Sequence, residues 1–129
     1  MFAVVVLAAM LANDEGAATP LPADIPSDAV FYTQEDARKM HMEDGYYPPK
    51  AANAHASGAV TIECEVGADG KLIRCAVLDE TPPDLGFGKA TAVLFLKHAK
   101  ITPEQPDTPL PASSWKKFRY IWKYDGRNG

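Results

Sequence analysis

The chain has 129 residues, of which 47% are hydrophobic and 23% are charged, and this composition suits a single globular domain with a modest core. Its net charge of -4 and pI near 5.3 argue against general nucleic-acid binding, because neutralising phosphates favours a basic surface. Most of the eleven prolines fall in residues 20–26 and 103–111, which we interpret as connecting segments rather than core.

The N-terminal residues have the pattern of a secretion signal. Residues 2–12 form an apolar run of signal-peptide length, too short for the roughly 20 residues that a membrane-spanning helix needs. Small residues at 16–18 would allow cleavage before Thr19, although no basic residue precedes the apolar run. We therefore expect residues 1–18 to be a signal peptide, and a buried N-terminal strand is the alternative.

A tether over 19–33 and six regular elements are expected after this segment. In chain order they are a helix over 34–44, a short helix over 48–55, strands over 60–66 and 72–78, a helix over 87–98 and a strand over 115–124. Thr33 is a suitable N-cap for the first helix, and Gly45 is a suitable residue just beyond its end. Proline at position 48 or 49 favours the start of the second helix.

The two central strands are expected to form a hairpin around Asp69-Gly70. Apolar and polar residues alternate over 60–66, and an Asp-Gly turn between two strand-forming runs is a strong hairpin signal. The predicted pairs, all on one face, are Val66 with Ile73, Cys64 with Cys75 and Ile62 with Val77. A slip of one residue would place Arg74 opposite Cys64, so the sequence itself specifies this register.

The same register predicts a disulfide bond between Cys64 and Cys75. Cross-strand partners lie within the Cα separation that a disulfide tolerates, and two reduced core thiols are the alternative. We expect a four-residue loop over 68–71, because it makes the cysteines a non-hydrogen-bonded pair with close side chains. Such bonds persist in oxidising compartments, which agrees with secretion.

The last predicted strand separates two kinds of side chain onto its two faces. One face carries Phe118, Tyr120, Trp122 and Tyr124, and the other carries Trp115, Lys117, Arg119, Ile121 and Lys123. This alternation predicts one buried and one wet face. The basic face has three interpretations, namely charges that protect and solubilise an edge, an edge that receives an acidic extended peptide, and an edge that pairs with a second copy.

Together these elements predict an α+β domain. We expect an antiparallel three-stranded sheet, made of the hairpin and the C-terminal strand, packed on two helices with an extra N-terminal helix. We expect no enzyme, since no nucleophile motif, phosphate loop or locally spaced carboxylate and histidine pair is found. His41, His55 and His98 fall on three different elements without ligand spacing, so no metal or cofactor is expected.

The order of several short motifs resembles the C-terminal domain of the TonB family of energy transducers. The motifs are Tyr47-Pro48 before Ala51 and Ala52, Gly58-x-Val60, Asp69-Gly70-Lys71-Leu72, Phe87-Gly88-Lys89-Ala90, Pro103 and the closing aromatic strand. The resemblance covers about residues 46–124, and we place the domain at 34–124 with a tail over 125–129. The paired cysteines also resemble a variant of this domain with cysteines on both hairpin strands.

The resemblance implies a non-enzymatic periplasmic binding module linked to TonB-dependent transport. Domains of this family capture a short extended segment of outer-membrane receptors, the TonB box, beside their last strand, which is β-strand addition. The binding residues that it implies here are Tyr47, Pro48, Trp115, Lys117, Arg119, Ile121 and Lys123. The alternative function is a structural or assembly module of the cell envelope that acts through homodimerisation by edge-strand pairing.

Overall fold

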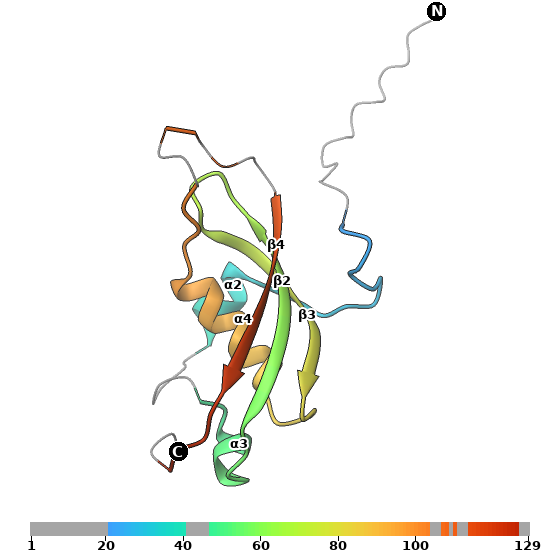
Figure 1. The fold of residues 1–129 in the computed structure, drawn as a ribbon, viewed down its shortest axis with the longest axis vertical. Coiled ribbons are helices and arrows are strands. Elements are labelled where there is room, and N and C mark those ends of the chain that lie inside the picture. The colour runs from blue at the N-terminus through green and yellow to red at the C-terminus, as the bar shows by residue number, and fades with distance from the viewer. Residues whose placement is uncertain (1–20, 41–46, 104–106, 109, 111–113, 127–129) are drawn as a thin grey trace, which may run out of the picture.

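The computed structural model describes residues 21–40, 47–103, 107–108, 110 and 114–126, and Figure 1 shows its arrangement. The elements are β1 (Phe31–Thr33), α2 (Gln34–Lys39), α3 (Pro49–Asn53), β2 (Gly58–Val66), β3 (Leu72–Thr81), α4 (Phe87–His98) and β4 (Ser114–Trp122). The strands form one antiparallel sheet in the order β1-β3-β2-β4. The α+β class is confirmed, but the described sheet has four strands instead of the predicted three. The added strand, β1, lies within the predicted tether and pairs with β3.

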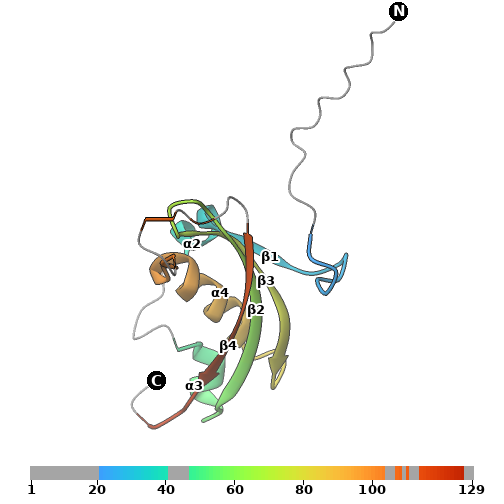
Figure 2. The same ribbon diagram turned by 45° about the horizontal axis from the view of Figure 1, so that its top comes forward.

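The core lies between one face of the sheet and the helices. The apolar side chains of the alternating run in β2, at positions 60, 62, 64 and 66, are all fully buried. Helix α4 contributes Phe87, Val93 and Leu96 to the same core, and it packs against β2 and β3. Figure 2 shows α2 and α4 on this side of the sheet, which we call the inner face. The opposite side is the outer face.

The hairpin register is confirmed at two of the three predicted pairs. Cys64 faces Cys75 and Ile62 faces Val77, whereas Val66 faces Leu72 and not Ile73. A register shift separates Val66 from the rest of β2, so Leu72 is buried and Ile73 is 43% exposed.

The shift begins in the turn. The Gly67 N–H donates to the Lys71 carbonyl at 2.8 Å, and the Gly70 N–H donates to the Gly67 carbonyl at 2.9 Å. Gly70 has a φ of 87°, the left-handed conformation that completes a three-residue turn with a bulge. This turn over 68–70 replaces the predicted four-residue loop and moves the last pair by one position.

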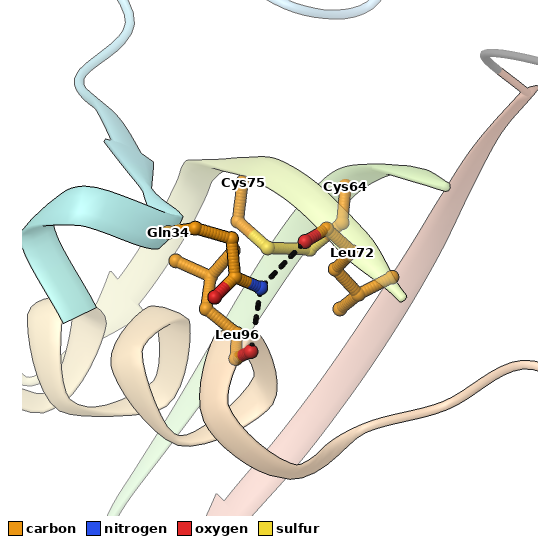
Figure 3. The surroundings of a disulfide bond; sticks show 5 residues. All are labelled: Gln34, Cys64, Leu72, Cys75 and Leu96. Carbon is orange, nitrogen blue, oxygen red and sulfur yellow. Dashed lines mark hydrogen bonds between the residues drawn. A yellow bond between two sulfur atoms is a disulfide. The ribbon is translucent and has the colours of Figure 1, made fainter. Parts of the chain in front are cut away.

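The predicted disulfide is confirmed. The two sulfur atoms of Cys64 and Cys75 are 2.08 Å apart, and both residues are fully buried. Their Cα atoms are 4.0 Å apart, which is the close spacing of a non-hydrogen-bonded pair. Figure 3 shows the Gln34 side chain beside this bond, where its Nε2 donates to the carbonyls of Leu72 and Leu96, each at 2.7 Å. Gln34 therefore ties α2 to both β3 and α4.

Several predicted boundaries are wrong by a few residues. Thr33 caps α2 as predicted, accepting a hydrogen bond from the Asp36 N–H, but the helix ends at Lys39 because Met40 is already extended. Its predicted end near Asp44 and Gly45 lies outside the described residues. Helix α3 is shorter than predicted, and α4 has the predicted bounds.

Strand β4 ends at Trp122 and not at the predicted Tyr124. Beyond the last pair, the Tyr124 N–H donates to the Ser57 hydroxyl at 2.9 Å and not to a backbone carbonyl, so the ladder with β2 stops there. The predicted signal peptide and His41 lie outside the described residues. Within the described ranges, no helix is long and apolar enough to cross a membrane.

Candidate binding edge

The sheet has one long edge that no described strand covers. β2 is paired along its two sides by β3 and β4, whereas β3 is paired by β2 on one side and by β1 only over residues 74–76 on the other. β4 therefore has a single partner among the described residues, and its far edge is open along nine residues. An open edge of this kind is a template for another extended chain.

The register shows which backbone groups of β4 face the open edge. Because Cys64 and Cys75 form a non-hydrogen-bonded pair, the N–H and C=O of Cys64 point away from β3 and toward β4. The partner of Cys64 in β4 is Lys116, and the pairing continues to Trp122 without a shift. The even-numbered residues of β4 thus bond β2, and the odd-numbered residues direct their N–H and C=O outward. These open-edge residues are Trp115, Lys117, Arg119 and Ile121.

The even-numbered aromatic residues of β4 belong to the core. The rings of Phe118 and Tyr120 lie 5.1 and 5.8 Å from the ring of Phe95 in α4. The Trp122 indole donates to the Thr91 hydroxyl at 2.7 Å. These contacts hold β4 against the helices and direct the side chains of the open-edge residues onto the outer face.

The outer face carries exposed cations and the ring of Trp115, which packs against Arg74. Lys117 and Arg119 are exposed, and Ile121 is 53% exposed. The half-buried Trp115 ring lies 5.2 Å from the Arg74 guanidinium, which is also held by an ion pair with Glu65 at 2.9 Å. The Trp115 end of the edge is therefore fixed, whereas the Arg119 and Ile121 end is open to solvent.

The segment before β1 reaches this same face. Asp24 forms an ion pair with Lys117 of β4, and the neighbouring Ile25 is buried. The Lys117 ammonium lowers the pKa of the Asp24 carboxyl, and Asp24 in turn raises the pKa of Lys117. Figure 2 shows residues 21–30 on the side of the sheet away from α4.

Glu63 of β2 completes this charged group. It is 7% exposed, and burial raises the pKa of its carboxyl, with the neighbouring Asp24 carboxylate raising it further. Its Oε1 and the Trp115 Nε1 are buried without a hydrogen-bond partner among the described residues. The sequence placed Glu63 on a wet face and Asp24 in a tether, so neither was predicted to belong to the site. Only the fold brings them to Lys117.

The structure separates the predicted site residues into two groups. The four open-edge residues lie together, and Lys123 follows β4 as an exposed residue. Tyr47 is 6% exposed, its ring packs edge-on against Trp122 at 5.3 Å, and its hydroxyl donates to the Ala56 carbonyl. Pro48 is buried and precedes α3. Tyr47 and Pro48 therefore lie in the packed end of the domain.

No group of three or more His, Cys, Asp or Glu side chains in the described ranges is placed to hold a metal ion. The edge instead offers backbone hydrogen-bonding groups and two cations.

Comparison with known proteins identifies the family of the chain. The family model of the Gram-negative bacterial TonB protein C-terminal region matches residues 44–122, which is more than half of the chain. Neither a curated protein nor a solved structure matches.

Proposed function

Because the chain belongs to the TonB C-terminal family, which is linked to TonB-dependent transport, we propose that it is a non-enzymatic protein-binding domain that captures extended segments by strand addition at β4. The observation that carries this proposal is the open edge of β4. Its odd-numbered residues direct their backbone groups outward, while on the other side of the hairpin β1 pairs with β3 over residues 74–76.

Backbone bonding supplies the affinity in this mode of binding. Trp115, Lys117, Arg119 and Ile121 each offer one N–H and one C=O to an added strand. Their alternating side chains supply selectivity, because an added strand continues the faces of the sheet.

The charge of the edge favours an acidic partner. Lys117, Arg119 and Lys123 are exposed cations in a chain whose net charge is -4, so this strip differs in sign from the molecule as a whole. We propose a TonB-box-like segment of an outer-membrane receptor as the partner and the periplasm as the compartment. The Cys64–Cys75 bond supports that compartment, because disulfides persist where the environment is oxidising.

The test is a titration of the full chain with TonB-box peptides, in which the backbone amide NMR signals of the protein are monitored. The largest shifts are expected at the open-edge residues. Ile121→Pro removes one outward N–H without breaking a bond to β2, and we expect about tenfold weaker binding. Ile121→Ala is the control, since it shortens the same side chain but keeps the N–H. Absence of shifts along β4 with every peptide, or equal binding by both variants, would contradict strand addition.

Homodimerisation through β4 is the alternative function. A symmetric antiparallel pairing of two β4 strands would gather Lys117 and Arg119 of both copies on one continuous face, and like charges at such positions are destabilising. This repulsion favours a foreign acidic segment over a second copy. Sedimentation from micromolar to millimolar concentration tests the alternative, and a monomer throughout would exclude it.

A further inference from the structure

Two cations occupy successive outward positions of β4. Lys117 and Arg119 are two residues apart, so their side chains lie on the same face. The Arg119 guanidinium donates to the Thr61 hydroxyl at 3.3 Å, and none of the ion pairs within the described residues includes it. Lys117 is held by Asp24 of the same chain. Among the described residues, Arg119 therefore has no carboxylate partner, and Lys117 has an intramolecular one.

A strand added beside β4 would have a fixed relation to these two positions. Residues directly opposite Lys117 and Arg119 would place their side chains on the outer face, within reach of the cations. Two carboxylates separated by one residue satisfy both cations. Two carboxylates on adjacent residues cannot pair with both Lys117 and Arg119. The side chain of the second residue falls on the inner face, beside Phe118 and Tyr120.

Asp24 already supplies one carboxylate to Lys117. It is held near β4 because Ile25, the next residue, is 6% exposed, and the Asp24 carboxylate accepts from the Lys117 ammonium. An incoming carboxylate opposite Lys117 would compete with Asp24 for the same ammonium group. The N-terminal segment is thus an intramolecular competitor for one of the two cations.

We propose that β4 selects extended partner segments that carry two carboxylates two residues apart, one pairing with Arg119 and the other taking Lys117 from Asp24. This inference rests on the proposed function, because it requires that the segment add beside β4. The spacing of the partner's acidic residues, and not their number, determines selectivity.

Three nine-residue peptides of alternating Val and Thr test the spacing in the full chain at 0.15 M salt. The first has Asp at its fourth and sixth positions, the second has Asp at its fourth and fifth, and the third has Asn at its fourth and sixth. We expect the peptide with Asp at positions four and six, the spaced peptide, to bind about tenfold tighter than the Asn peptide. The peptide with Asp at positions four and five should bind about threefold tighter than the Asn peptide.

Two charge variants test whether Lys117 is one of the cations that pair with the peptide. Lys117→Gln should weaken the spaced peptide about threefold and leave the Asn peptide unchanged. Lys116→Gln is the matched control, because it removes the same charge from the neighbouring position on the inner face. Equal losses in both variants would mean that only net charge matters, and this would overturn the spacing proposal.

Asp24→Asn tests the competition. It should raise affinity for the spaced peptide about twofold in the wild-type background and have no effect in Lys117→Gln. No gain in the wild-type background would overturn the displacement of Asp24. If all three peptides shift the β4 amides with equal affinity, strand addition stands and the inference fails. If none of them, nor any TonB-box peptide, shifts the β4 amides, both fail.

Discussion

Loss of the Cys64–Cys75 bond should destabilise the domain by an amount that the structure allows us to separate into two parts. The cysteines are 11 residues apart in sequence, and closing a loop of this size stabilises by about 3 kcal/mol in the chain-entropy model. Both side chains are fully buried, so Cys64→Ala with Cys75→Ala also leaves two sulfur-sized voids, each costing about 1 kcal/mol.

The assay compares urea unfolding of three species, which are the oxidised chain, the chain refolded in reductant, and the double alanine variant. Reduction alone should cost about 3 kcal/mol, or about 15 °C in Tm, and the double variant about 5 kcal/mol. Adding reductant to the double variant is the control and should change nothing. Domains of this size are stable by about 5 to 15 kcal/mol, so the double variant is expected to be marginal.

A reduced chain within about 1 kcal/mol of the oxidised one would refute the argument from loop closure. The burial of Cys64 and Cys75 gives a second test, because a reductant can reach their sulfur atoms only when the hairpin opens. Thiol release in native buffer should therefore accelerate steeply with urea. A fast release that does not depend on urea would show that the bond is accessible in the folded state.

Two further changes test the inner and outer faces of the sheet. Gly58→Ala should destabilise by about 2 kcal/mol, because a Cβ there would lie 2.5 Å from the Phe87 ring and 2.8 Å from the Thr81 carbonyl oxygen; unfolding at the wild-type urea midpoint would disprove this clash. The folded chain retains the Glu63 proton to higher pH than the unfolded chain, so stability should fall as pH rises above the unfolded pKa near 4.5. Glu63→Gln should remove that decline and be more stable than wild type at pH 7, and an unchanged slope between pH 5 and 8 would show that Glu63 does not cause it. The lowered pKa of Asp24 acts in the opposite direction only below its usual value of 3.8, outside this range.

Local patterns were sufficient to predict the central hairpin and its cross-link. The alternation in β2 and the Asp69-Gly70 turn placed Cys64 opposite Cys75, because a one-residue slip would expose the whole buried set. The same reasoning was wrong for Val66, since the three-residue turn sets the pairs next to it by backbone bonding, and the register then shifts between Glu65 and Val66.

Features that depend on distant contacts could not be predicted. β1 has three residues, too few to show a period, and it is a strand because β3 offers it an edge. Asp24 lies in a proline-rich stretch without periodicity, and only the folded sheet brings it to Lys117. The family resemblance implied that Tyr47 binds a partner, which stays a prediction; the packing of its ring into the core against Phe87 and Trp122 was not predicted. An aromatic residue in a motif looks the same in the sequence whether it binds a partner or packs in the core.

The position of the disulfide within the strand order has a mechanical consequence. A pull between the N-terminal side of the chain and a segment held on β4 would load the sheet across its strands, passing from β1 to β3, then to β2 and β4. The Cys64–Cys75 bond joins β3 to β2 covalently, so the middle junction on this path cannot separate by breaking hydrogen bonds alone. The shortest junction is then the three-residue pairing of β1 with β3. Gln34, the residue after β1, reinforces it through its hydrogen bonds to β3 and α4. Under tension the sheet would yield at its outer junctions, and the hairpin would move as one rigid piece.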